Sequence, residues 1–266
     1  MSYLCTVRSA DKLSNGQRTV INVAMAVKDK YKHIVSLFNK LIGAHQLWEL
    51  WEDAMTFYAL SISNVVDERF KAEREERYMN TVKKYRPEEM QIFTEIFAEI
   101  VIQMEREPEQ DFLGDLYMTL DLGSHWHGQF FTPYNVCKCM AEMQVQLPQD
   151  DTLKPITVSD PACGGGALLI AAFHSYRKQL EKRGLNAQDY VICYAQDISY
   201  VAGLMCYIQL SLQGIAAKVK IADSLLDPLV DADNGSNIWY TPMYFSFAWT
   251  GRRIIRRLEE DRRCLI

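Results

Sequence analysis

In the first half of the chain, apolar residues recur every three or four positions, the spacing of an amphipathic helix. Between residues 20 and 42 the apolar positions are Val23, Val27, Ile34, Leu37, Phe38, Leu41 and Ile42. The segment 45–66 is rich in Leu, Trp and Tyr, whereas 68–84 is so strongly charged that we expect a solvated helix face or a hairpin. Pro87, with two glutamates after it, predicts the start of a further helix, which should end before Pro108.

From residue 156 the pattern changes to an alternation of short apolar segments and helices. Two short helices precede this change, one over 111–120 and one opened by the pair Thr132-Pro133. Strands are then predicted over 156–159, 190–195 and 218–222, with helices over 167–182 and 199–212 and a last helix from about Phe247. Such alternation predicts a parallel sheet with right-handed crossovers. We therefore expect an α/β protein with an all-α N-terminal domain (1–125) and a sheet-containing domain (126–266).

The most informative segment is the turn Asp-Pro-Ala-Cys-Gly-Gly-Gly-Ala at residues 160–167, between a β-branched run and a helix of small residues. Glycine permits left-handed backbone angles and the close approach of a ligand. Ligands of open α/β sheets bind at such turns, outside the carboxyl ends of the strands. The turn lacks both the G-x-G-x-x-G spacing and a Gly-Lys-Ser/Thr ending, which favours a ligand without a pyrophosphate. The alternative is a turn that only connects a strand to a helix.

Residues 160–167 resemble the S-adenosylmethionine-binding loop of the adenine-N6 DNA methyltransferases, and more narrowly of the modification subunits of type I restriction systems. A second segment, Gly-Gln-Phe-Phe-Thr-Pro at 128–133, resembles the segment that precedes this loop in the family and packs against the methionine end of the cofactor. The resemblance covers roughly 111–224. It implies S-adenosylmethionine as the cofactor, DNA as the substrate, and direct transfer of the cofactor's methyl group to a flipped-out adenine.

Three aspartates end the three predicted strands, so they should lie side by side at one edge of the sheet. Asp197 is placed to accept hydrogen bonds from the ribose hydroxyls, and the resemblance puts Asp223 at the amino group of the cofactor's adenine. By resemblance, the cofactor site comprises Phe130, Thr132, Pro133, Asp160, Ala162, Gly164, Gly166, Asp197 and Asp223. The alternative for each aspartate is a turn former or helix cap, and for Phe131 a place in the core.

The family's catalytic turn, Asn/Asp-Pro-Pro-aromatic, is not found in this sequence. The nearest segment is Tyr-Thr-Pro-Met-Tyr-Phe at 240–245. If this segment holds that place, Thr241 accepts a hydrogen bond from the adenine amino group, Pro242 keeps the turn, and Tyr244 stacks on the base. The alternative is an ordinary buried strand and turn.

About four strands can be placed, whereas a complete methyltransferase sheet has seven, so the expected fold is an incomplete Rossmann-like methyltransferase sheet. Two functions follow. The first is an S-adenosylmethionine-binding member of the family whose methyl transfer to DNA is weak or depends on a partner, such as another restriction-modification subunit or a second methyltransferase half. The second is a non-catalytic interaction protein that mimics a modification subunit and modulates a restriction-modification complex.

Charge and composition narrow these functions. The net charge of −5 means that DNA contact requires a local basic patch or a partner. Such a patch is offered by the last helix, which carries Arg252, Arg253, Arg256, Arg257, Arg262 and Arg263, although a solvated face or a dock for an acidic partner fits equally well. Seven cysteines without a zinc spacing indicate reduced thiols in a cytoplasmic protein. No apolar run is long enough to span a membrane. No metal is expected, because His125 and His127 have no third ligand nearby.

Overall fold

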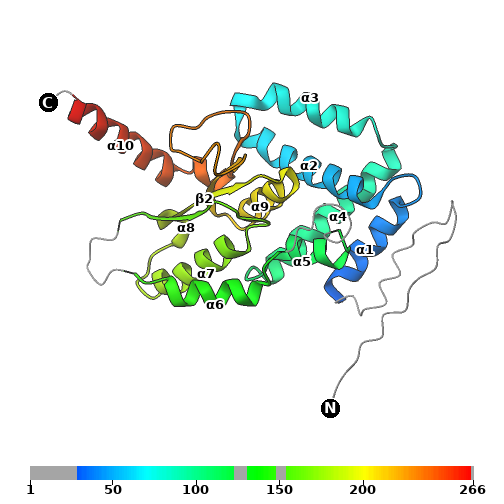
Figure 1. The fold of residues 1–266 in the computed structure, drawn as a ribbon, viewed down its shortest axis with the longest axis horizontal. Helices are drawn as coiled ribbons and strands as arrows, with labels where there is room; N and C mark the ends of the chain where they lie inside the picture. Colours follow the sequence, from blue (N-terminus) through cyan, green and yellow to red (C-terminus); the bar gives the residue numbers. More distant parts are fainter. Residues whose placement is uncertain (1–28, 123–130, 148–153, 265–266) are drawn as a thin grey trace, which may run out of the picture.

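Helices make up the N-terminal part of the computed structural model, which describes residues 29–122, 131–147 and 154–264. These elements are α1 (Asp29–Leu41), α2 (Leu47–Val66), the 3-10 turn η1 (Glu68–Phe70), α3 (Lys71–Val82), α4 (Pro87–Arg106) and α5 (Phe112–Thr119). They gather at one end of the molecule, and the sheet lies at the other (Figure 1). Within the described residues, none of the helices combines the length and the apolar character that crossing a membrane requires.

Most of the helices expected from the spacing of apolar residues are present. Helix α4 begins at Pro87 and ends at Arg106, as predicted from the proline and the glutamates that follow it. The charged segment 68–84 forms a helix, α3, and not a hairpin. Residues 20–28 of the first predicted helix and the pair His125 and His127 lie outside the described residues.

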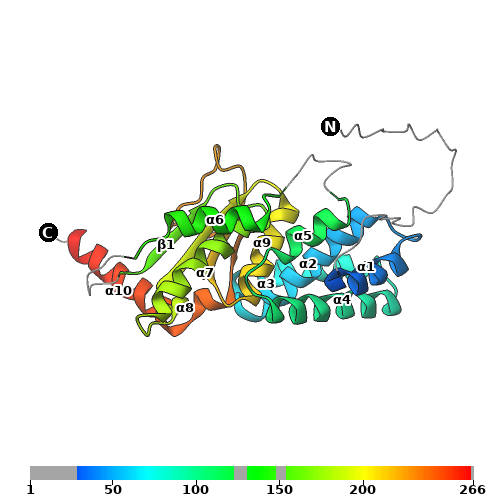
Figure 2. The same ribbon diagram turned by 90° about the horizontal axis from the view of Figure 1, so that it is seen from below.

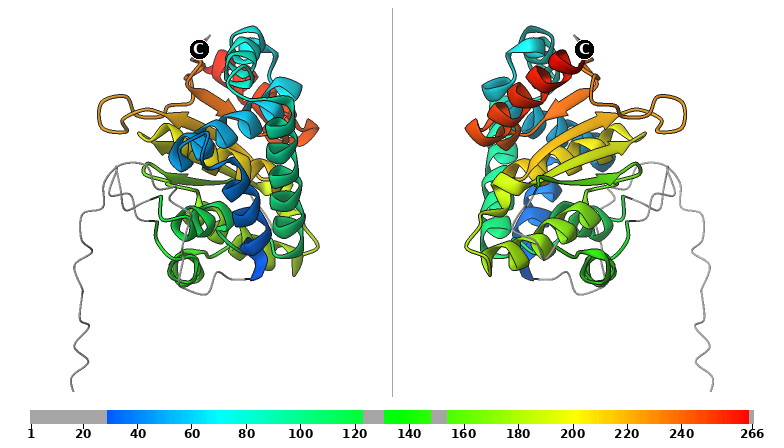
Figure 3. Two further views of the ribbon diagram at one scale, coloured as in Figure 1. Left: turned by 90° about the vertical axis from the view of Figure 1, so that its right-hand side faces the viewer. Right: turned by 90° about the vertical axis from the view of Figure 1, so that its left-hand side faces the viewer.

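The second half contains a four-stranded sheet with helices between its first three strands. Its elements are α6 (Tyr134–Gln144), β1 (Ile156–Asp160), α7 (Ala167–Glu181), α8 (Ala187–Tyr190), β2 (Val191–Asp197), α9 (Tyr200–Leu212), β3 (Ala216–Ile221), β4 (Ile238–Tyr240), the 3-10 turn η2 (Pro242–Phe245) and α10 (Phe247–Cys264). The strand order is β1-β2-β3-β4, and Figure 3 shows the strands stacked in this order, with β4 nearest to α10. The first three strands are parallel, as predicted from the β-α alternation.

Strand β4 departs from the parallel pattern, because it pairs antiparallel with β3. A parallel return needs a crossover, usually a helix, that packs on the sheet, and the connection 222–237 contains no helix. Instead, this connection is fixed to the sheet by two buried lysines. The Lys218 ammonium donates to the carbonyl of Val230 at 2.8 Å, and the Lys220 ammonium donates to the Asp227 carboxylate at 2.6 Å. The chain therefore turns back beside β3 instead of crossing the sheet.

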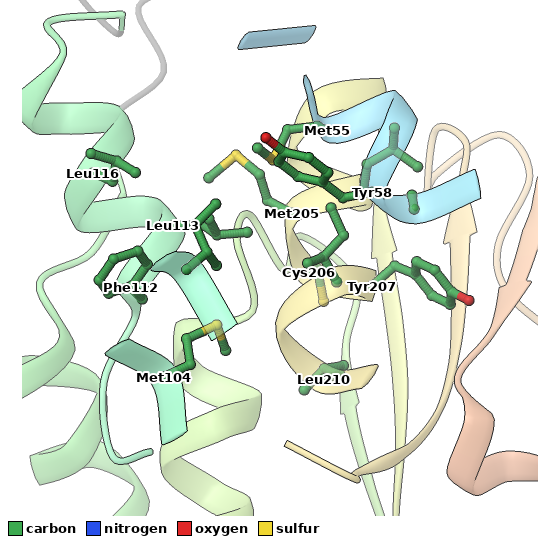
Figure 4. Close-up of a cluster of buried hydrophobic side chains, with 14 of the residues drawn as sticks. Met55, Tyr58, Met104, Phe112, Leu113, Leu116, Met205, Cys206, Tyr207 and Leu210 are labelled. Carbon is green, nitrogen blue, oxygen red and sulfur yellow. The ribbon is translucent and has the colours of Figure 1, made fainter. Parts of the chain in front are cut away.

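One hydrophobic core runs through the helical part and the sheet part of the molecule. Figure 4 shows side chains of α2, α4, α5 and α9 meeting in it, among them Leu113 of α5 and Met205 of α9. Helix α9 is thus buried between the helical part and the strands, and its residues Leu204–Leu210 are all inaccessible to solvent. The predicted division into two domains at residue 125 stays a prediction.

A buried arginine adds a polar connection between the two parts. The Arg74 side chain, on α3, is 4% exposed. Its guanidinium donates to the Ser63 hydroxyl at 2.6 Å, to the Asp67 carboxylate at 3.0 Å and to the carbonyl of Ile238, on β4, at 2.8 Å. It also lies 4.4 Å from the centre of the Trp239 ring. This explains why a strongly charged helix has a buried face.

Replacing Arg74 should therefore destabilise the whole protein. In Arg74→Met, the buried Asp67 carboxylate loses one of its cationic partners and the Ile238 carbonyl loses its donor, so we expect a loss of about 3–5 kcal/mol in the free energy of unfolding. Urea unfolding followed by circular dichroism measures it. Lys71→Met, on the same helix, removes only an exposed ion pair with Glu68 and should cost less than about 1 kcal/mol. Equal losses in both variants would contradict the role given to Arg74.

Candidate functional site at the carboxyl edge of the sheet

The glycine-rich turn joins β1 to α7, and two of its glycines have left-handed backbones. The φ angles of Gly164 and Gly166 are 53° and 94°. There is also no room for a side chain at either position. A Cβ on Gly164 would lie 2.9 Å from the Phe131 ring, and one on Gly166 would lie 3.0 Å from the Cys206 sulfur. Backbone angle and space together explain why these positions are glycine.

Asp197, at the end of β2, holds this turn in place. Its side chain accepts a hydrogen bond from the backbone N–H of Gly164 at 2.8 Å through Oδ2, and one from the N–H of Ser199 at 2.8 Å through Oδ1. The residue is 8% exposed. The backbone N–H of Cys163 also donates to the carbonyl of Gln196 at 2.9 Å. The turn is therefore fastened to the tip of the neighbouring strand and has a fixed shape.

Asp160, at the end of β1, brings a second carboxylate to the same place. Its Oδ1 accepts a hydrogen bond from the N–H of Ala162 at 3.1 Å. Burial raises the pKa of the Asp160 carboxyl, and the nearby negative charge of Asp197 raises it further, whereas the Ala162 hydrogen bond acts in the opposite direction. A carboxylate held beside a second one forms a site that favours a cation or several hydroxyl donors.

Asp223 lies at the same edge, just beyond β3. The N–H of Ala222 donates to the carbonyl of Asp197 at 3.0 Å, which fixes the ends of β2 and β3 side by side. The Asp223 carboxylate accepts from the N–H of Leu225 at 2.9 Å, so one of its oxygens forms a turn. The structure thus brings Asp160, Asp197 and Asp223 to one edge, as expected from parallel strands, and each of them also has the local turn role that was the alternative.

The segment before α6 lies beside the turn. The Phe131 ring covers Gly164 and meets the Tyr117 ring edge-on, with 5.2 Å between the ring centres. Thr132 and Pro133 are exposed. Pro133 occupies the N-cap position of α6, so the expected capping by Thr132 does not occur. Small residues of α6 and α7, including Cys137, Ala141, Ala167 and Ala171, pack together and set these helices side by side (Figure 2). Phe130 lies outside the described residues.

Sequence reasoning missed two buried polar residues that contact the turn. Gln209 of α9 donates to the carbonyl of Gly165 at 2.8 Å and to the Asp111 carboxylate at 2.7 Å. The sequence does distinguish Gln209 from its neighbours, because it is a single amide within the apolar run of α9. Asp111 was recognised only as the start of a helix.

Thr241, Pro242 and Tyr244 lie far from this edge, so the structure does not bring them together with the aspartates, and their catalytic role stays a prediction. Because β4 is antiparallel, Thr241 lies beside the start of β3, and the length of β3 puts it roughly 15–20 Å from the aspartates. The Thr241 hydroxyl is fully buried, donates to the carbonyl of Ile215 at 2.7 Å and accepts from the N–H of Ala217 at 2.8 Å. The Tyr244 ring packs against the Tyr240 ring at a tilt of 53°, with 4.4 Å between the ring centres. These residues belong to the fold, as in the alternative of a buried strand and turn.

The arginines of α10 that the structure describes are engaged within the chain. Arg252 lies 4.9 Å from the centre of the Trp249 ring, Arg253 lies 4.0 Å from that of Tyr244, and Arg256 pairs with Asp231 at 2.8 Å. The DNA-binding role of this face stays a prediction. Among the side chains that the structure describes, no cluster of three or more His, Cys, Asp or Glu is arranged to hold a metal ion.

The raised pKa of Asp160 predicts how stability depends on pH. Below the ordinary carboxyl pKa both the folded and the unfolded states are protonated, so the group has no effect. As the pH rises through the higher pKa of the folded state, ionising the buried carboxyl costs stability. Asp160→Asn removes this cost. The free energy of unfolding of the variant, relative to that of the wild type, should therefore be higher at pH 7 than at pH 4. Urea unfolding at both pH values measures the difference, and a constant difference would contradict the assignment.

The buried hydroxyl of Thr241 predicts a structural cost. Thr241→Val leaves the N–H of Ala217 without its acceptor, so we expect a loss of about 1–3 kcal/mol in the free energy of unfolding. Thr241→Ser keeps the hydroxyl and serves as the matched control, with a smaller loss. Thermal unfolding of both variants measures the order, and the opposite order would refute the structural role.

A comparison with protein-family models agrees with this geometry. Residues 109–263 match the model of the family described as N-6 DNA methylase. No curated protein matches the chain significantly. The family match covers more than half of the chain and includes α5, the glycine turn and all three strand-end aspartates. The chain therefore belongs to the adenine-N6 DNA methyltransferase family.

Proposed function

We propose that this chain binds S-adenosylmethionine over the turn Gly164–Gly166. The observation that carries the proposal is the bond between the Asp197 carboxylate and the Gly164 N–H, with Asp160 beside it. It brings two carboxylates to a glycine turn at the carboxyl edge of a parallel sheet, where ligands of α/β proteins bind.

The residues at this edge fit such a ligand chemically. S-adenosylmethionine carries a sulfonium and an ammonium group, which the Asp160 carboxylate would attract. Each Asp197 oxygen already accepts one backbone N–H and retains a second lone pair for a ribose hydroxyl. Asp223 would meet the adenine, and Thr132 and Pro133 would line the methionine side together with Phe130. Ala162, Gly164 and Gly166 would supply the backbone of the cradle.

Methyl transfer by this chain would need groups beyond those at its cofactor edge. The cofactor supplies an activated methyl group on its sulfonium. The acceptor, an adenine amino group in DNA, must be held by a hydrogen-bond acceptor and an aromatic ring. The sequence contains no pair of consecutive prolines, and the nearest substitute, Thr241 with Tyr244, is at the opposite edge. We therefore propose activity that depends on a partner, such as a second methyltransferase half or another restriction-modification subunit. The site belongs to an incomplete Rossmann-like methyltransferase sheet, in a cytoplasmic protein.

The position of Thr241 also favours a second candidate, a non-catalytic protein that modulates a restriction-modification complex. Such a protein would keep the fold of a modification subunit without the chemistry. Its effect would not depend on the cofactor, so Asp197→Ala would leave it intact.

Binding is tested by calorimetric titration of the purified protein with S-adenosylmethionine. Asp197→Ala removes the acceptor of the Gly164 N–H, and we expect an affinity at least about tenfold weaker than that of the wild type. Asp189→Ala, an aspartate just before β2 at the other edge, is the matched control and should bind normally. No binding by the wild type, or equal binding by all three proteins, would refute the cofactor site.

A transfer assay with labelled cofactor and DNA completes this test. Binding without transfer by the chain alone is the expected result. Efficient transfer by the isolated chain would show that the acceptor site is complete and that partner dependence is wrong.

A further inference from the structure

A buried amide on α9 connects three parts of the molecule. Gln209 is fully inaccessible to solvent. Its Nε2 donates both hydrogens, one to the carbonyl of Gly165 at 2.8 Å and one to Oδ1 of Asp111 at 2.7 Å. Its Oε1 accepts from the backbone N–H of Leu113 at 3.1 Å. The amide therefore joins the middle of the glycine turn to the start of α5, in the helical part.

Asp111 completes this connection. It is 3% exposed, and it also accepts from the N–H of Gly114 at 3.0 Å as the N-cap of α5. Burial raises the pKa of its carboxyl, although the hydrogen bonds from Gln209 and Gly114 oppose this effect. The cap of α5 and the amide of α9 are thus parts of one hydrogen-bonded group.

The turn lies directly on this pair. A Cβ at Gly165 would be 3.3 Å from Oδ1 of Asp111, closer than side chains normally pack, and 3.5 Å from Nε2 of Gln209, an ordinary van der Waals contact. Its neighbour Gly164 is held from the other side, because its N–H binds Asp197. Two adjacent glycines are therefore fixed by different elements, one by β2 and the other by α9.

The packing of α5 against α9 does not by itself require the pair Asp111 and Gln209. Leu113, Met205 and Leu210 already make an apolar contact between α5 and α9 (Figure 4). A buried carboxylate with its partners adds little stability over apolar side chains of the same size. What an apolar pair cannot provide is a donor for the Gly165 carbonyl, which fixes the orientation of the peptide beside the site.

We propose that Asp111 and Gln209 are positioning residues that hold the glycine turn in its ligand-binding conformation and make the affinity for the cofactor depend on the packing of α5. This inference rests on the proposed function, because its test measures the affinity for S-adenosylmethionine.

An exchange of the acid and the amide separates positioning from structure. Gln209→Glu places two carboxylates together and leaves the Gly165 carbonyl without a donor. Adding Asp111→Asn restores one donor and one acceptor between the two side chains, with the charge of the wild type, but the Gly165 carbonyl still has no donor. The double variant should therefore regain most of the stability that Gln209→Glu loses, while its affinity for S-adenosylmethionine stays about tenfold weaker than that of the wild type. If the pair is only structural, stability and affinity return together, and the inference is overturned.

Arg74→Met is the matched control, because it breaks a buried connection between the helical part and the sheet at β4, away from the turn. It should lose stability and keep its affinity. An equal loss of affinity in Arg74→Met would show a general loosening and overturn the inference. The wild type is titrated alongside. If the wild type does not bind S-adenosylmethionine, the proposed function fails. If the wild type binds and the double variant binds equally well, only the positioning role is refuted. If Gln209→Glu does not fold, the comparison of the double variant with the wild type is sufficient to test the positioning role.

Discussion

The hydrogen bond from the Gly164 N–H to the Asp197 carboxylate is the interaction on which the site depends. It crosses from β1 to β2 at the edge where parallel strands end, and it determines the shape of the turn without filling it. The positive φ angles of Gly164 and Gly166 then direct the chain into α7. Because a buried carboxylate must be satisfied, this bond also explains why Asp197 has so little solvent exposure.

The helical part and the sheet act as one unit through α9. This helix is buried on all sides, since α2 and α5 cover the face that is turned away from the strands. Buried polar side chains add to this apolar contact. Arg74 joins α3 to β4, and the pair Asp111 and Gln209 joins α5 to the glycine turn. The helical part thereby contributes to the position of the glycine turn, although it carries none of the three strand-end aspartates.

Membership in the methyltransferase family and the position of the predicted catalytic turn lead to different conclusions. The family match includes the cofactor edge, where Asp160 and Asp197 lie together. Thr241 is buried near the start of β3, and its hydroxyl is consumed by two backbone bonds. The expected role requires this hydroxyl to accept a hydrogen bond from a base, whereas the Thr241 side chain is fully buried and held by backbone groups on both sides. Cofactor binding and base binding are therefore separate questions for this protein.

The sequence by itself determined the helices, the three parallel strands and the aspartates at their ends, because periodicity, glycines and strand-end acids are local signals. It left open the direction of β4, which follows in the structure from a connection that turns back beside β3 and is held there by two buried lysines. It also gave no sign that Asp111 and Gln209 meet, because they lie 98 positions apart. Only the tertiary structure could bring such residues together, since a buried polar group gains its role from partners that are distant in the chain.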